Sequence, residues 1–190
     1  MKNIIIFASG SGTNAENIIN YFSNGEKAKV TLVLSNKPQA FVLERAKRLS
    51  VETYFFDRHK FYDTEEVLSM VREKCPDLIV LAGFLWLVPK MFTDAYRNRI
   101  INIHPALLPD FGGKGMYGEK VHNAVISEGR KESGITIHYV NEVYDSGDII
   151  FQAKCEVLPG DTAETLAQRV HALEYEHYPR VINEILDSLP

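Results

Sequence analysis

The chain has few cysteines, no long hydrophobic run and no excess of positive charge. Its two cysteines, Cys75 and Cys155, lie far apart without C-x-x-C spacing, so we expect neither a disulfide framework nor a structural zinc site. The apolar residues 4–8 are too short for a signal peptide, and no stretch approaches the length of a membrane span. With 21 basic and 25 acidic side chains, the net charge of −4 argues against general attraction to nucleic acid or anionic membranes. We therefore expect a cytoplasmic protein that binds neither.

Short apolar runs alternate along the chain with segments of helical period. Strands are expected near residues 3–8, 30–35, 52–56, 77–82, 99–103, 135–140 and 148–157, and helices near residues 14–23, 40–49, 64–75, 89–96 and 119–129. The strands over residues 4–7 and 78–81 are continuously apolar, as strands buried on both faces require. The pattern predicts a single α/β domain over residues 1–190, with a Rossmann-like, open, mostly parallel twisted sheet of about seven strands and helices on both faces.

A last helix is expected from Thr162, with Asp161 as its N-cap. Its apolar residues recur at three- or four-residue spacing, which is typical of a helix packed on a sheet. Pro179 interrupts this pattern, so we expect the helix to be kinked or divided there.

Residues 9–14, here called the amino-terminal glycine loop, follow the first strand and open a helix. Gly10 and Gly12 allow close backbone approach, and the helix N-terminus favours an anion such as phosphate. With Ala15 the segment also fits a relaxed dinucleotide fingerprint, G-x-G-x-x-A. The acidic residue expected at the end of the second strand is replaced by Ser35-Asn36-Lys37, which disfavours NAD without excluding NADP. A tight turn that binds no ligand is the alternative.

Asn102 and His104 stand two residues apart at the end of an apolar run. Pro105 favours an extended conformation at His104, and residues i and i+2 of a strand point to the same face. An amide beside an imidazole suits oxyanion stabilisation and proton transfer. The alternative is that His104 is a structural histidine and Asn102 caps a turn.

Residues 141–148 form a polar turn between the two late strands. Asp145 could meet His104, orient it and favour its protonated form, with Asp148 as the rival carboxylate and surface acidity as the alternative explanation. Residues 112–118, called the 112–118 loop below, contain four glycines in seven residues and are expected to form a mobile loop, with an active-site lid as a further hypothesis.

Five segments in register over nearly the whole chain resemble the phosphoribosylglycinamide formyltransferase family. These are residues 7–14 (FASGSGTN), 35–37 (SNK), 81–84 (LAGF), 102–109 (NIHPALLP) and 145–147 (DSG). The resemblance implies a cytoplasmic purine-biosynthesis enzyme of the formyltransferase fold. It would transfer the formyl group of the co-substrate 10-formyltetrahydrofolate to the amine of glycinamide ribonucleotide without a metal, as a monomer or homodimer.

The same resemblance implies roles for individual residues. It assigns catalysis to Asn102, His104 and Asp145, and the ribonucleotide phosphate and ribose to Gly12, Thr13, Asn14, His171 and Glu174. It assigns folate binding to Leu85, Trp86, Leu87, Val88, Asn102, Asn141, Glu142, Val143, Tyr144 and Asp145. Residues 1–100 would form the phosphate-binding half, and residues 101–190 the catalytic and folate-binding half.

A family arginine that contacts folate falls near Arg58 and His59 and is left unassigned. His171 occupies a position that is often glutamine in the family, and the 112–118 loop is several residues longer than the family pattern. The alternatives are another formyl-folate enzyme, such as a deformylase or a different amine formyltransferase, an NADP-dependent oxidoreductase, and a binding module without catalytic activity.

Overall fold

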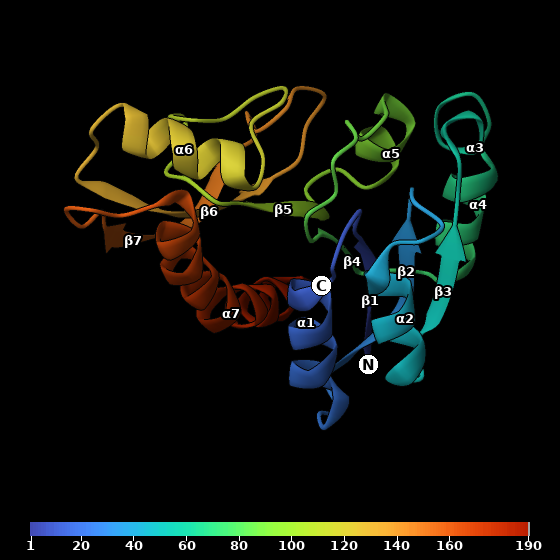
Figure 1. Ribbon diagram of the computed structural model, residues 1–190. Helices are drawn as coiled ribbons and strands as arrows, with labels where there is room; N and C mark the ends of the chain where they lie inside the picture. Colours follow the sequence, from blue (N-terminus) through green and yellow to red (C-terminus); the bar gives the residue numbers. More distant parts are fainter. Residues whose placement is uncertain (190) are drawn as a thin grey trace.

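The computed structural model describes residues 1–189, which are built around one seven-stranded sheet (Figure 1). The strands are β1 (Lys2–Phe7), β2 (Ala28–Ser35), β3 (Glu52–Phe55), β4 (Leu78–Leu81), β5 (Ile100–His104), β6 (Glu132–Tyr139) and β7 (Ile149–Glu156), in the order β3-β2-β1-β4-β5-β6-β7. The pairs from β3 to β5 are parallel, whereas β6 and β7 add antiparallel pairs. The predicted mostly parallel sheet is confirmed.

Helices cover both faces of the sheet. The first face carries α1 (Thr13–Ser23), α2 (Phe41–Arg48), α6 (Glu119–Ser127) and α7 (Ala163–Ser188), and the second carries α3 (Arg58–Tyr62), α4 (Glu66–Glu73) and α5 (Lys90–Ala95). The short α3 was not anticipated from the sequence. The two layers correspond to two separate hydrophobic clusters.

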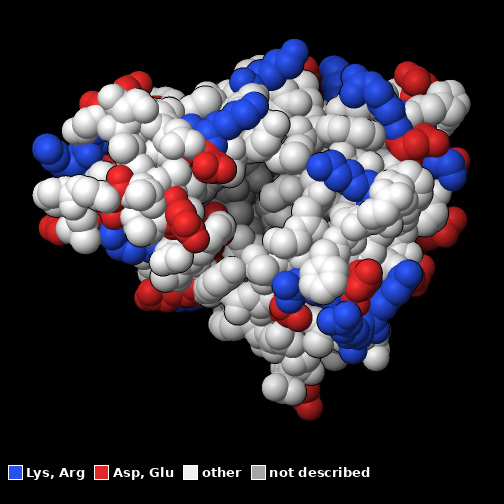
Figure 2. Space-filling view, viewed as in Figure 1, with Lys and Arg blue, Asp and Glu red and all other residues white. Residues whose placement is uncertain are grey.

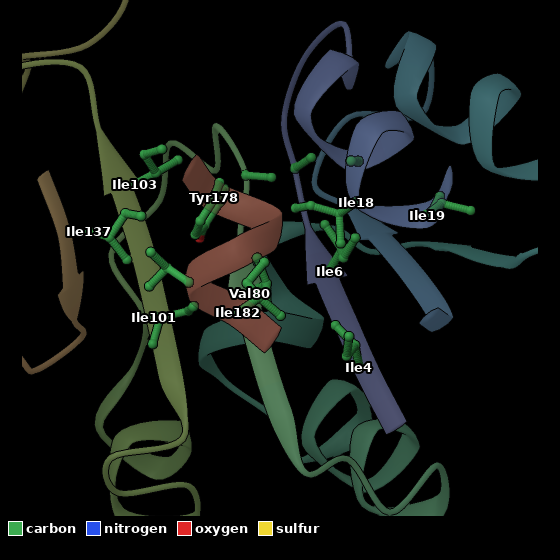
Figure 3. Close-up of a cluster of buried hydrophobic side chains, with 14 of the residues drawn as sticks. Ile4, Ile6, Ile18, Ile19, Val80, Ile101, Ile103, Ile137, Tyr178 and Ile182 are labelled. Atoms are coloured by element: carbon green, nitrogen blue, oxygen red, sulfur yellow. The ribbon is translucent and has the colours of Figure 1, made fainter. Parts of the chain in front are cut away.

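The continuous apolar runs in the sequence contribute side chains to both hydrophobic clusters. In β1, Ile4 and Ile6 pack into the first cluster, which Figure 3 shows around Tyr178 and neighbouring isoleucines, while Ile5 and Phe7 pack into the second. Successive strand side chains point to opposite faces, so only a continuous apolar run can fill both layers. Because these strands are apolar on both faces, helices have to cover both faces of the sheet.

The last helix differs from its sequence prediction at two points. Its N-cap is Thr162 rather than Asp161, because the Thr162 hydroxyl accepts a hydrogen bond from the Thr165 N–H at 3.2 Å. The helix is also undivided at Pro179, so the predicted division is wrong. Pro179 has no N–H for the Tyr175 carbonyl one turn earlier, and the Asn17 side chain donates to that carbonyl at 2.9 Å instead.

The carboxyl ends of β1, β4 and β5 lie next to one another in the sheet. The amino-terminal glycine loop follows β1, residues 82–85 follow β4, and His104 ends β5. Ligands of open parallel sheets bind at this edge, beyond the carboxyl ends of the strands. In residues 1–189, no helix is long and apolar enough to cross a membrane.

Candidate active site

A cavity of about 870 Å³ opens at the carboxyl ends of these strands. In the space-filling view of Figure 2 the surface is hollowed near its centre. The cavity is lined by residues 9–14, 82–85, 102–105 and 113–119, together with Lys37, His122, Tyr144, Asp145, Ala163, Glu164, Ala167, His171 and Glu174. Side chains from both ends of the chain therefore meet in one site.

The structure brings together the three side chains assigned to catalysis. Asn102 and His104 come from the end of β5, and Asp145 comes from the turn between β6 and β7. The Asn102 amide nitrogen donates to Asp145 Oδ1 at 3.5 Å, and His104 Nδ1 lies 3.6 Å from Asp145 Oδ2. Asp148, the rival carboxylate, is exposed and does not line the cavity.

The protonation of His104 follows from its partners. Its Nε2 lies 2.8 Å from the Phe111 carbonyl oxygen, which can only accept, so Nε2 carries the proton of the neutral ring. Burial lowers the pKa of His104, and this effect outweighs the opposing charge of Asp145. Asp145 therefore favours the protonated ring as expected, but the net shift favours the neutral one.

Asp145 itself stays ionised. Burial raises the pKa of its carboxyl, but its contacts with His138, His104 and the Gly113 N–H together hold that pKa below its ordinary value. The Gly113 N–H donates to Oδ2 at 2.9 Å. The 112–118 loop is thereby tied directly to the carboxylate.

His138 is a site residue that the sequence reasoning missed. It is buried in β6 and pairs in register with Asn102 of β5. Its Nδ1 donates to the Tyr139 carbonyl at 2.8 Å, so the neutral ring offers Nε2 as the acceptor for the Asn102 amide at 3.1 Å. Nε2 also lies 3.6 Å from Asp145. The available signal was its place on the predicted strand 135–140, which leads into the polar turn that carries Asp145, but the sequence does not specify the pairing register.

The amino-terminal glycine loop forms the opposite end of the cavity. Gly12 is the N-cap of α1 with φ +77°, and no side chain caps that helix, so the N–H groups of its first turn face the cavity unpaired by a cap. A Cβ at Gly12 would lie 2.4 Å from the Val42 side chain, so the close approach of α2 requires glycine. Thr13 and Asn14 follow in the same turn.

A buried carboxylate lies beside this helix N-terminus. Glu174 of α7 is only 4% exposed, and its Oε2 accepts from Asn14 Nδ2 at 2.8 Å and meets His171 Nδ1 at 2.9 Å. The Glu174 hydrogen bond raises the pKa of His171, against the effect of burial. All five residues assigned to the ribonucleotide therefore line one end of the cavity.

Ser9 links this loop to the strand ends on either side. Its hydroxyl donates to Asn36 Oδ1 at 2.7 Å and accepts from the Leu85 N–H at 3.0 Å. Asn36 of the motif at residues 35–37 thus supports the amino-terminal glycine loop. In a dinucleotide-binding fold, an acidic residue at the end of this strand would instead bind the ribose.

The residues assigned to folate lie in two groups. Leu85, Asn102, Tyr144 and Asp145 line the cavity. The other assigned residues lie outside it: Val88 is buried in the second hydrophobic cluster, Trp86 packs against that cluster, the Leu87 carbonyl accepts from Tyr62, and Asn141, Glu142 and Val143 are exposed.

Arg58 and His59 differ in their surroundings. The Arg58 guanidinium lies 4.7 Å from the Tyr62 ring centroid and 5.8 Å from that of Trp86. His59 instead contacts Asp63 at 3.2 Å on the exposed side of α3. Of the two, Arg58 is the residue next to the segment assigned to folate. Within residues 1–189, no group of three or more His, Cys, Asp or Glu side chains is arranged to hold a metal ion.

Comparisons with known proteins agree with this geometry. A family model described as formyl transferase matches residues 2–182. Phosphoribosylglycinamide formyltransferase of Bacillus subtilis is 37% identical over 191 residues, covering 98% of this chain and 95% of that protein. The chloroplastic phosphoribosylglycinamide formyltransferase of Arabidopsis thaliana is 39% identical over 193 residues, covering 98% of this chain but 66% of its own length.

Solved structures are similar over nearly the whole chain. Glycinamide ribonucleotide transformylase 1 from Symbiobacterium toebii superposes with a TM-score of 0.90 at 35% identity, covering 99% of this chain and 89% of that one. Phosphoribosylglycinamide formyltransferase from Bacillus halodurans gives a TM-score of 0.87 at 39% identity, covering 97% and 95%. The similarity extends over both the glycine loop and the strand that carries Asn102 and His104.

Proposed function

The chain belongs to the formyl transferase family, and from this we propose that it transfers the formyl group of 10-formyltetrahydrofolate to the amine of glycinamide ribonucleotide, a step of purine biosynthesis. The observation that carries the proposal is the meeting of Asn102, His104 and Asp145 in the same cavity as an uncapped helix N-terminus. The first group suits acyl transfer and the second suits a phosphate. An enzyme that formylates a phosphorylated amine needs both.

The reaction joins the substrate amine to the formyl carbon. The neutral amine attacks the carbonyl, a carbon–nitrogen bond forms and negative charge collects on the oxygen. The intermediate then expels the folate N10, which takes up the proton lost by the amine. The products are the formyl amide and tetrahydrofolate.

Each member of the trio has a distinct part in this sequence. The Asn102 amide stabilises the oxyanion, and His104 assists once it is protonated. Asp145 orients the imidazole and helps carry the proton, through water, from the amine toward N10. In support, Asp145 remains ionised and His104 neutral in the free protein, so the pair starts ready to accept a proton.

The two substrates would approach from opposite ends of the cavity. Gly12, Thr13 and Asn14 bind the phosphate with His171. Glu174 accepts hydrogen bonds from the ribose hydroxyls through Oε1, which has no hydrogen-bond partner within residues 1–189, while Oε2 accepts from Asn14 and contacts His171. The folate lies against residues 85–88 and 141–145. The proposed division into a phosphate-binding half (residues 1–100) and a catalytic and folate-binding half (residues 101–190) is therefore not strict, because His171 and Glu174 lie in the second half and residues 85–88 in the first.

The alternatives have less support. Deformylases and other formyl-folate enzymes share the formyl donor, but several of the most similar relatives at 36–39% identity are phosphoribosylglycinamide formyltransferases. An NADP-dependent oxidoreductase is not favoured, because Asn36 binds Ser9 rather than facing a nucleotide ribose. We further propose a cytoplasmic enzyme, monomeric or homodimeric, whose partners are these two small molecules rather than nucleic acid.

An absorbance assay tests the function. The purified protein is mixed with 10-formyltetrahydrofolate and glycinamide ribonucleotide, and consumption of the formyl donor is followed. Loss of the donor that requires the amine supports the proposal. Donor loss without the amine indicates a deformylase, and protection against thermal unfolding by NADP but not by folate indicates the oxidoreductase.

A further inference from the structure

His122 is a buried histidine that no step of the proposed reaction uses. It lies on α6, is 2% exposed and lines the cavity. Its Nδ1 is buried and has no hydrogen-bond partner within residues 1–189. A buried polar atom without a partner costs stability, so an apolar side chain would serve better if packing were the only role of this position.

The groups around His122 place it at the ribonucleotide end. Burial lowers the pKa of His122, His171 lowers it further, Glu174 opposes the shift and His104 adds a smaller lowering. Helix α6 also packs against α7, which carries His171 and Glu174. The imidazole therefore lines the cavity from the helix that packs against α7, and it senses the charges of these groups.

The lowered pKa and the unpaired Nδ1 together indicate which proton the ring carries. A ring neutral at pH 7 holds one proton, on either Nδ1 or Nε2. Buried N–H groups without an acceptor are rarer than buried acceptors without a donor, so the proton belongs on Nε2. His122 can thus supply one N–H donor, from Nε2, to a ligand in the cavity.

We propose that His122 is a ribonucleotide-binding residue, whose Nε2–H donates a hydrogen bond to a ribose-phosphate oxygen next to Glu174. The inference rests on the proposed function, because it names a further contact for the same substrate. An oxygen of the sugar phosphate matches a neutral donor, and Glu174 and the amino-terminal glycine loop hold that part of the ribonucleotide from the other sides.

Two amide variants test the donor position. In His122→Gln the amide nitrogen can reach the position of Nε2, whereas in His122→Asn it lies near that of Nδ1. We expect His122→Asn to raise the KM for glycinamide ribonucleotide about tenfold, since one hydrogen bond to the substrate is lost, with the folate KM and kcat nearly unchanged. His122→Gln should retain most of the wild-type KM. An unchanged KM in His122→Asn overturns the inference, and so does an equal rise in both variants.

A third variant separates binding from folding. His122→Phe keeps a ring in place and removes both nitrogens, so we expect it to fold and to lose most of the rise in unfolding temperature that glycinamide ribonucleotide gives the wild type. A full ribonucleotide-induced rise in this variant contradicts the proposal. The matched control is His177→Asn, a partly buried histidine of α7 that does not line the cavity, and its KM should stay at the wild-type value. If the wild type itself consumes no formyl donor, the proposed function fails, whereas the ribonucleotide-induced shift still reports on His122.

Discussion

The backbone N–H of Gly113 donates a hydrogen bond of 2.9 Å to the Asp145 carboxylate. The contact joins the 112–118 loop, which follows β5 by a few residues, to the turn between β6 and β7. The carbonyl of Phe111, two residues before Gly113, accepts a hydrogen bond from His104. One short segment therefore fixes both the imidazole and the carboxylate, so a change in its backbone should affect catalysis more than substrate binding.

Replacing Asp145 with asparagine should lower kcat severely. The variant removes the charge that opposes burial at His104 and supports its protonation. By comparison with the loss of an oxyanion donor, we expect at least a hundredfold decrease, or about 3 kcal/mol of barrier. The glycinamide ribonucleotide KM should change little. Steady-state kinetics of Asp145→Asn and of the exposed control Asp148→Asn test this expectation. Near-normal turnover in Asp145→Asn would instead assign the catalytic carboxylate to Asp148.

Replacing Gly112 with alanine should impair turnover through the same loop. A Cβ at this position would lie 2.6 Å from Leu108 Cδ2 and 3.2 Å from Asp145 Cβ, so the Leu108 side chain or the loop must shift and Asp145 must give slightly. We expect kcat to fall about tenfold, since small displacements of reacting groups are costly. Gly25→Ala is the control, because its Cβ would meet only ordinary contacts. Equal kcat values for Gly112→Ala and the wild type would show that the loop does not position Asp145.

Ribonucleotide binding should weaken as the pH rises. The Glu174 hydrogen bond raises the pKa of His171 above 6.5, so the imidazole is charged below that raised pKa and loses its charge as the pH increases through it. The positive charge favours the phosphate dianion, whose own second ionisation is complete above about pH 7. The KM for glycinamide ribonucleotide, measured from pH 7 upward, should therefore rise.

The control for this pH dependence is His171→Gln, which keeps a polar side chain that cannot titrate. Its KM should be higher than that of the wild type at pH 7 and should vary less with pH. A profile in the variant that follows the wild-type profile would assign the dependence to another group. The His171–Glu174 ion pair also stabilises the fold at pH values below the raised pKa of His171, and this stabilisation is lost as the pH rises above that pKa. Because the His171 side chain is half exposed, the contribution is small.

Arg58→Ala should weaken folate binding selectively. The guanidinium lies over the rings of Tyr62 and Trp86, next to the segment assigned to folate, and its charge suits the carboxylates of the folate tail. We expect the KM for 10-formyltetrahydrofolate to rise several-fold, with the ribonucleotide KM unchanged. His59→Ala, which removes a neighbouring exposed histidine, should have no effect. A rise in the His59 variant alone would transfer the contact to that residue.

Much of the fold was determined by local patterns. Continuous apolar runs such as residues 4–7 are compatible only with strands covered on both faces, and the intervening helical periods supply the covers. Gly12 likewise indicates a loop, and the two-residue spacing of Asn102 and His104 places both side chains on one face of a strand. Both inferences need only short-range geometry. The carboxyl ends of parallel strands lie at one edge, which brought these two motifs into one predicted site.

Other features depended on contacts between distant segments. The register that sets His138 opposite Asn102, the Gly113 hydrogen bond to Asp145 and the burial of His122 beside α7 each join residues that have no periodic relation in the sequence. The hydrogen bond from Asn17 of α1 to the Tyr175 carbonyl, which Pro179 leaves without its helical donor, is likewise a contact between distant segments. The sequence by itself determined every strand, all helices except the short α3, and where the strand ends carry chemistry, because propensity and periodicity act over a few residues. Only the tertiary structure decided which side chains complete the site, because burial and hydrogen bonding depend on packing between elements far apart in the chain.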